Sequence, residues 1–165
     1  MKNVTGLFAC VWLWLLVVTG CPKNGSDPGP AVDAALVVGS WQVTQLTANP
    51  AVVSPTHRAN SDVLLLYQQN IGRDCVGPAR YVFLPDGKLH LTTSTECQNQ
   101  LNSLFGFMTA NWRTSGRELR IEGVYDALSY TVTQQNAQTM VWQRTEYNSP
   151  FDGKTHQYIM TLSKR

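Results

Sequence analysis

The sequence predicts an all-β fold, an eight-stranded antiparallel up-and-down barrel with one short helix. The first observation behind this prediction is an alternation of apolar and polar residues in eight separate segments, the period of strands with one buried face. The second is that short turns join most of these segments, which favours antiparallel neighbours. The third is a physical requirement: a meander of this length leaves exposed edges unless it closes. With 165 residues, 43% of them hydrophobic, the chain can bury one core, and we expect one domain.

The clearest element is a hairpin around residues 84–87, Leu-Pro-Asp-Gly. Pro and Gly stand where a type I turn followed by a bulge requires them. Tyr81 and Phe83 share one face of the strand before the turn, and Leu89 and Leu91 share one face of the strand after it. The turn therefore fixes the register that points these four side chains into the core.

The remaining elements follow in chain order. Trp41 and Val43 share one face of the first strand, and residues 47–60, with two prolines and little periodicity, are expected to be loop. A helix capped by Ser61 or Asp62 is expected through residues 63–67 and ends before Gly72; a buried strand is the alternative for this short apolar run. The eight predicted strands are 38–46, 79–84, 88–94, 107–114, 118–123, 127–134, 139–147 and 155–163.

Alternation also assigns side chains to the barrel interior. The candidate ligand pocket consists of Tyr81, Phe83, Trp112, Tyr130, Trp142, Arg144, His156 and Tyr158. Arg144 and His156 stand near strand ends, where a polar group facing an apolar cup could bind the polar end of a ligand. Alternatively, these two side chains turn to solvent, or Arg144 packs over a tryptophan to close the barrel. Trp41 is expected to be a structural plug at the barrel floor.

Residues 1–20 are expected to be a targeting segment, with Lys2 at the basic end and an apolar run over 7–18 that is short for a membrane span. Its end, Val-Thr-Gly-Cys at 18–21, resembles the bacterial lipobox, which implies cleavage before Cys21 and acylation of that residue. An ordinary secretory signal is the alternative. Residues 21–35, rich in Pro, Gly and small polar residues, are expected to be a flexible tether, and 36–165 the barrel domain. The expected location is the bacterial cell envelope, anchored by lipid to the outer membrane.

The cysteines fit this assignment. Cys10 leaves with the signal and Cys21 takes the lipid, so Cys75 and Cys97 remain as one pair in an oxidising compartment. A disulfide is the simplest outcome. The alternatives, two metal ligands or a redox pair, lack a C-x-x-C spacing or a nearby pair of histidines.

Several short motifs resemble the bacterial lipocalin-like domain family. They are Gly39-Ser40-Trp41 in the first strand, the hairpin ending Phe83-Leu84-Pro85-Asp86-Gly87 between Cys75 and Cys97, Ala110-Asn111-Trp112, and the C-terminal Met160-Thr161-Leu162-Ser163-Lys164. Ala110 and Asn111 depart from the small polar residues usual there. The resemblance covers roughly 36–165 and implies an up-and-down barrel that holds an apolar ligand. It carries over no catalytic residue.

Composition excludes some function classes. With Lys2 removed, 12 of the 13 basic residues remain against 11 acidic ones, a net charge of +1, and the basic residues are scattered, so no nucleic-acid partner is expected. We find no catalytic or phosphate-binding motif, and we expect neither an enzyme, a metal nor a cofactor. Two hypotheses remain for a monomer: a tethered carrier of a small apolar or amphipathic ligand, and an envelope interaction or inhibitor module whose barrel is filled by its own side chains.

Overall fold

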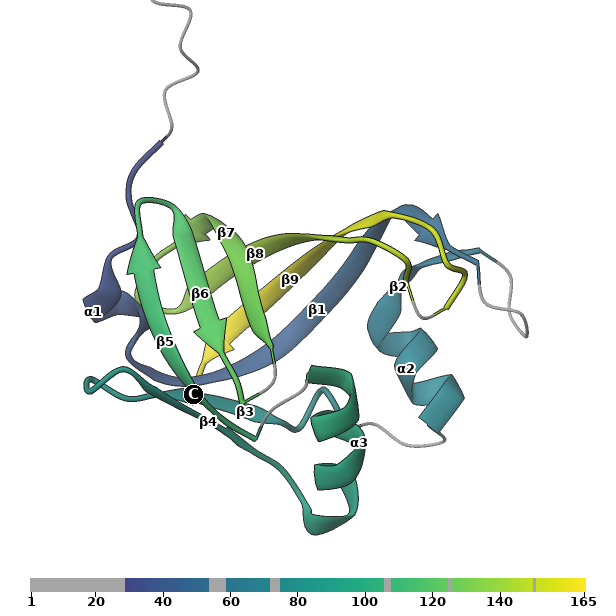
Figure 1. The fold of residues 1–165 in the computed structure, drawn as a ribbon, viewed down its shortest axis with the longest axis horizontal. Coiled ribbons are helices and arrows are strands. Elements are labelled where there is room, and N and C mark those ends of the chain that lie inside the picture. Colours follow the sequence, from purple (N-terminus) through teal and green to yellow (C-terminus); the bar gives the residue numbers. More distant parts are fainter. Residues whose placement is uncertain (1–28, 54–58, 72–74, 106–107, 125, 150) are drawn as a thin grey trace, which may run out of the picture.

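The structure is a computed structural model that describes residues 29–53, 59–71, 75–105, 108–124, 126–149 and 151–165. The strands form one sheet in the order β2-β1-β3-β4-β5-β6-β7-β8-β9, and an additional pairing of β1 with β9 closes it. Every pairing is antiparallel. The predicted fold class is therefore confirmed: β1 and β3 to β9 make a closed barrel of eight sequential strands, and β2 adds a short ninth strand beside β1 (Figure 1).

The barrel strands are close to those predicted. Their bounds are β1 (Gly39–Val52), β3 (Arg80–Phe83), β4 (Lys88–Thr92), β5 (Thr109–Ser115), β6 (Glu118–Glu122), β7 (Ala127–Gln135), β8 (Thr139–Glu146) and β9 (His156–Lys164), with β2 at Asn60–Asp62.

The hairpin between β3 and β4 has the predicted register. Phe83 lies opposite Leu89 and Tyr81 opposite Leu91, and all four side chains are buried. The Leu84 N–H donates to the Lys88 carbonyl at 2.8 Å across the turn. Gly87 has a φ of 81°, a left-handed conformation that explains the need for glycine at this position.

The prediction of a loop over 47–60 is wrong for the first part of this range, because β1 continues to Val52. The continuation pairs with β9, where Ala48 lies opposite Tyr158, and with β2, where Thr47 lies opposite Asp62. Pairing with β9 and β2 thus keeps this segment in a strand, although its proline would by itself predict the end of a strand.

Three helices are present among the described residues, where one was expected. The predicted helix is α2 (Val63–Ile71), and the Asp62 side chain accepts from the Leu65 N–H at 3.1 Å near its start. The additional helices are α1 (Ala34–Val37) and α3 (Thr95–Phe105). The α3 sequence is mostly polar, but Cys97, Leu101, Leu104 and Phe105 recur at the spacing of one helix face, so its helical pattern is present in the sequence although the helix was not predicted.

The predicted disulfide between Cys75 and Cys97 is present. It joins the chain after α2 to the first turn of α3, so it links the two helical connections rather than the two strands of the hairpin.

The packed domain begins before the boundary expected at residue 36. The Val32 N–H donates to the Gly116 carbonyl at 2.7 Å, and Val32 packs against the core. Asp33 exchanges hydrogen bonds with the Gln135 side chain, both 2.9 Å long. Residues 29–35 are therefore in part attached to the barrel, whereas the proposed signal segment, Cys21 and the first part of the tether lie outside the described residues. Within the described part of the chain, no helix is both long and apolar enough to cross a membrane.

Candidate functional site

The two ends of the barrel differ in what covers them. At one end, called the floor, lie the β3–β4, β5–β6 and β7–β8 turns together with α1. At the other end, called the mouth, lie the β6–β7 turn, the β8–β9 loop, α2 and α3. Figure 1 shows this separation, with α1 on the left and α2 and α3 on the right. Any site inside the barrel must be reached from one of these ends.

Trp41 lies at the floor and is fully buried. Its indole N–H donates to the Val37 carbonyl of α1 at 2.7 Å, and the Lys164 ammonium lies over its ring, 5.2 Å from the ring centroid. The residue thus joins the first helix to the barrel wall and is not accessible to a ligand.

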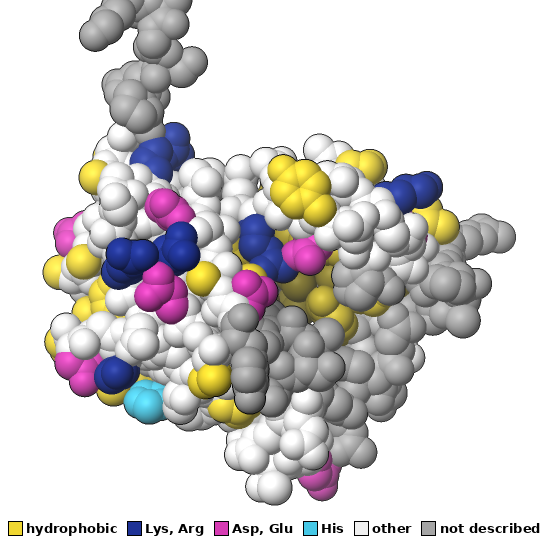
Figure 2. All heavy atoms as spheres, viewed as in Figure 1, with side chains coloured by type: hydrophobic (Ala, Val, Ile, Leu, Met, Phe, Trp, Pro, Cys, Tyr) yellow, Lys and Arg dark blue, Asp and Glu magenta, His cyan; other side chains and the backbone are white. Residues whose placement is uncertain are grey.

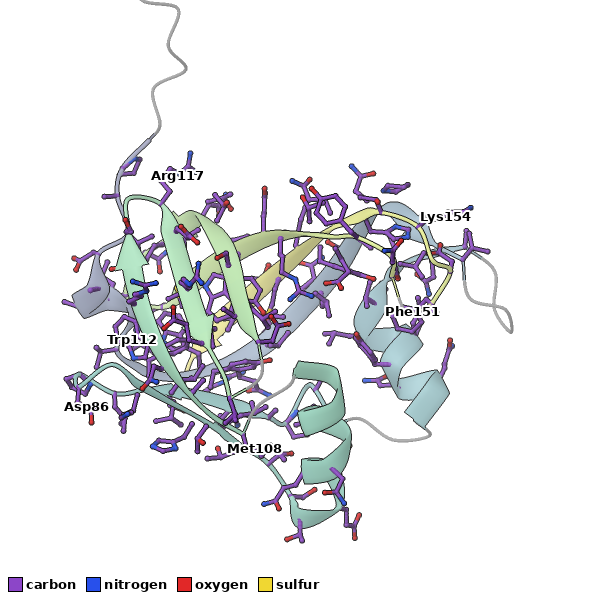
Figure 3. The ribbon with its side chains drawn as sticks, viewed as in Figure 1. Asp86, Met108, Trp112, Arg117, Phe151 and Lys154 are labelled. Atoms are coloured by element: carbon purple, nitrogen blue, oxygen red, sulfur yellow. A yellow bond between two sulfur atoms is a disulfide. The ribbon has the colours of Figure 1, made fainter. Side chains whose placement is uncertain are left out.

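Phe83 and Trp112, two of the pocket candidates, also lie toward the floor. Their ring centroids are 5.5 Å apart, and the Trp112 indole N–H donates to the Leu84 carbonyl of the β3–β4 turn at 3.1 Å. In Figure 3 Trp112 accordingly lies near Asp86 of that turn, on the opposite side of the molecule from Phe151. The structure gives these two rings a packing role, away from the mouth.

Trp142 occupies the middle of the barrel. Its ring is surrounded by those of Tyr130, Phe83 and Tyr81, at centroid distances of 5.0, 5.9 and 6.0 Å. The Trp142 indole N–H is buried and has no hydrogen-bond acceptor among the described residues. A buried donor without an acceptor costs free energy, so it marks a place for an acceptor that the described residues do not supply.

Arg144 follows Trp142 by two residues on the same face of β8, one step closer to the mouth. Its guanidinium lies 5.7 Å from the Tyr130 ring centroid, a cation–π contact. It also forms an ion pair with Glu146, and both side chains are about a quarter exposed, at 26% and 27%. The alternative that Arg144 packs over a tryptophan is therefore not what the structure shows, because the ring beneath the guanidinium belongs to Tyr130.

Tyrosine hydroxyls gather around this arginine. The Tyr158 hydroxyl is 3.0 Å from that of Ser149, and the Tyr67 ring of α2 packs edge to face on Phe151 at 5.2 Å. Burial raises the pKa of Tyr67 to about 12, and burial likewise raises the pKa of Tyr130 although Arg144 opposes the shift. These phenols therefore remain protonated at neutral pH and can donate hydrogen bonds.

His156, another candidate, is used by the chain itself. The ring is fully buried, with Nδ1 2.8 Å from the Pro50 carbonyl oxygen and Nε2 2.9 Å from the Asp152 carboxylate. Asp152 also accepts from the Val53 N–H at 3.1 Å and the Lys154 N–H at 3.0 Å. This group, called the latch, ties the β8–β9 loop to the end of β1 and leaves neither imidazole nitrogen for a ligand.

Of the eight candidate pocket residues, the structure therefore brings five together between the barrel middle and the mouth: Tyr81, Tyr130, Trp142, Arg144 and Tyr158. Sequence reasoning missed Tyr67, Glu146 and Phe151. Glu146 could have been found, because strand alternation from Trp142 and Arg144 puts it on the same face. Tyr67 and Phe151 reach the site from a helix and a loop, whose positions strand alternation does not describe.

The surface at the mouth is hollowed and partly apolar. Figure 2 shows a hollow on this face in which basic and acidic side chains lie beside a hydrophobic surface. The exposed large hydrophobic residues of the described chain lie at the mouth. They are Val53, which directly follows β1, Leu65 of α2, Val124 of the β6–β7 turn and Tyr147 of the β8–β9 loop.

Two other hollows lie outside the barrel wall. One hollow, of about 230 Å³, lies between β7 and the segment that leads into α1. The other, of about 440 Å³, lies over β4, β5 and the β6–β7 turn. Among the residues that the structure describes, no group of three or more His, Cys, Asp or Glu side chains could hold a metal ion. Comparison with models of protein families, with curated proteins and with solved structures found no match for this chain.

Proposed function

We propose that this protein is a lipocalin-like binding protein of the bacterial envelope that holds a small amphipathic molecule at the barrel mouth. The observation that carries the proposal is the largely buried Arg144 side chain, whose guanidinium lies over the Tyr130 ring where the interior opens. A concave, largely aromatic surface with a few polar groups is what a small-ligand site requires. No covalent step is needed for this function, and we propose a monomeric binding protein rather than an enzyme.

The ligand must be small or only partly enclosed. Trp142 and the rings around it fill the middle of the barrel, so space for a ligand lies on the mouth side of Trp142. Tyr67 and Phe151 supply apolar surface there, and Arg144 with the tyrosine hydroxyls supplies polar groups.

We further propose that the signal segment is removed before Cys21, that Cys21 is acylated, and that the following residues tether the barrel to the outer membrane. The support is the lipobox-like segment at 18–21, together with the first described backbone contact of the chain to the barrel at Val32. Mass measurement of the mature N-terminal peptide tests this directly: an unmodified cysteine or a different N-terminus refutes the anchor.

Native mass spectrometry of the protein purified from its own cell tests the binding function. We expect an adduct of a few hundred daltons in the unmodified chain and its loss in Tyr130→Leu, which removes the ring under Arg144. Thr131→Ala, on the exposed outer face of the same strand, is the matched control and should keep the adduct. A chain that shows only its own mass in every variant contradicts the proposal.

One observation favours a second candidate, the interaction module with a filled barrel. Val124 and Tyr147 are 78% and 72% exposed at the mouth end, where a protein partner could cover them. Crosslinking of the protein in intact cells distinguishes the candidates. A protein crosslinked through position 147, in the absence of any small-molecule adduct, supports the second candidate over the first.

A further inference from the structure

The groups at the inner side of the mouth are mostly hydrogen-bond donors. The Trp142 N–H is buried without an acceptor among the described residues, and the Arg144 guanidinium can donate five hydrogen bonds but has no acceptor capacity. Both groups lie on one face of β8, and the Tyr130 ring contacts both, at 5.0 Å from the Trp142 ring and 5.7 Å from the Arg144 guanidinium.

We infer that the ligand carries a carboxylate, and that this group lies innermost, between the Trp142 N–H and the Arg144 guanidinium. This inference rests on the proposed function and specifies the chemical class of its ligand. A carboxylate accepts several hydrogen bonds and donates none, so it complements these two donors. The apolar body of the ligand then points outward and lies against Tyr67 and Phe151 at the mouth.

In the free protein the Glu146 carboxylate pairs with Arg144, as the carboxylate of the ligand would. It pairs with Arg144 from two residues further along β8, and it is exposed enough to turn to water when another anion enters. While it stays in place it neutralises Arg144, and it repels an incoming anion. Glu146 is therefore a positioning residue that weakens carboxylate binding and selects against ligands that cannot displace it.

The Tyr67 and Tyr130 side chains stay uncharged, so they do not repel a bound anion. Burial keeps the pKa of Tyr67 and Tyr130 above the ordinary value, so neither becomes a second negative charge in the site. The burial of the Trp142 indole also keeps water away from the inner end, which strengthens the interaction of a bound anion with Arg144.

Titration with octanoate, methyl octanoate and 1-octanol tests the inference, because the three share an apolar body and differ in the polar end. The exported chain carries Cys21→Ser so that it brings no acyl chain of its own. We follow binding by calorimetry and by the indole N–H signal of Trp142 in ¹⁵N NMR, assigned with Trp142→Phe. Octanoate should shift this signal and bind at least tenfold more tightly than the ester or the alcohol.

Two variants with opposite effects keep the test independent of folding defects. Arg144→Gln should weaken octanoate binding roughly tenfold or more, and Glu146→Gln should strengthen it severalfold. The exposed pair of Arg113 and Glu122, with 2.9 Å between its charged atoms on the outer wall, provides matched controls: Arg113→Gln and Glu122→Gln should leave binding unchanged.

The outcomes separate the inference from the function on which it rests. Equal binding of acid, ester and alcohol, with the Trp142 signal displaced by all three, refutes the carboxylate and keeps the binding site. Octanoate binding that Glu146→Gln does not strengthen refutes the role given to Glu146. Failure of all three compounds to bind at the mouth, while the chain remains folded, counts against the proposed function itself.

Discussion

The latch of His156 and Asp152 makes the stability of the barrel depend on pH in a direction that the structure fixes. The Pro50 carbonyl and the Asp152 carboxylate are both acceptors, so both imidazole nitrogens must carry a hydrogen and the buried ring is an imidazolium. Burial alone would lower the pKa of His156, but the hydrogen bonds to Asp152 and Pro50 outweigh it, and the pKa is raised above 6.5.

The sign of the effect follows from these shifts. Below pH 6.5 the histidine is charged in both the folded and the unfolded chain, and the latch contributes fully. Above that value the unfolded chain releases the proton first, so the free energy of unfolding falls as pH rises through the pKa of the folded state. Burial opposes ionisation of Asp152, but hydrogen bonds from His156, Val53 and Lys154 lower its pKa to about 2. Its contribution is therefore lost only as pH falls from about 4 toward 2.

The magnitude follows from the burial of the pair, whose side chains are 0% and 6% exposed. Removing one partner of a buried ion pair costs about 3 to 5 kcal/mol, and we expect about 3 kcal/mol for His156→Gln at pH 5.5, because glutamine restores one hydrogen bond. One proton can change the free energy of unfolding by at most about 1.4 kcal/mol per pH unit. The difference between the wild type and His156→Gln should therefore shrink at no more than this rate above pH 6.5.

Urea denaturation between pH 5 and 9, followed by circular dichroism, measures these free energies. His90→Gln is the control for the loss of an imidazole, since His90 lies in β4, away from the latch, and this variant should keep the wild-type dependence on pH. The reasoning fails if wild type and His156→Gln lose stability in parallel above pH 6.5, or if the wild type becomes more stable there.

Three further predictions concern the framework of the barrel. Cys75→Ser should lower the free energy of unfolding by about 3 kcal/mol, because the disulfide closes a loop with a sequence separation of 22; an unchanged melting temperature under reducing conditions would count against it. Trp41→Ala should cost about 3 to 5 kcal/mol in urea denaturation, since the ring is fully buried, and a loss below 1 kcal/mol would contradict its position at the floor. Gly39→Ala should destabilise the barrel more than Gly116→Ala, because Gly39 has a φ of 135°, which residues with a side chain rarely adopt, whereas Gly116 has a φ of 56°, in the left-handed region that they can enter at a lower cost; equal melting temperatures would refute this difference.

The barrel wall could be predicted from sequence because strand alternation is a local property. Tyr81, Phe83 and Trp142 each stand in a short alternating segment, and all three are buried as predicted. The hairpin at residues 84–87 added register, since its turn residues determine which strand positions face each other.

The extension of β1 could not be predicted in the same way, whereas helix α3 could have been. Pro50 interrupts the local strand pattern, and the segment is held by pairing with β9 and β2, which come later in the chain. The extension therefore depends on contacts between distant segments, which a local pattern does not contain. In α3, by contrast, Cys97, Leu101, Leu104 and Phe105 recur at helical spacing, so a local pattern for this helix was present in the sequence.

Part of the candidate site could not be predicted from the sequence for a different reason. Alternation assigns a side chain to the inner face of a strand but not to a height along the barrel axis, because that height depends on strand tilt and stagger. Trp112 and Tyr130 are equivalent by alternation, yet Trp112 bonds to a turn at the floor, while Tyr130 lies beneath Arg144.

The inward-facing side chains of β8 also differ in their height along the barrel axis. From the middle of the barrel toward the mouth, one face of this strand carries Trp142, then Arg144, then Glu146, and exposure rises along the series from 1% to about a quarter. A donor without an acceptor among the described residues lies deepest, a cation follows, and the acceptor that neutralises the cation lies outermost. A ligand that enters with its apolar end first would leave the Trp142 N–H unpaired, whereas one that enters with an acceptor first pairs it. The order of these three residues thus favours a ligand bound with its polar end inward.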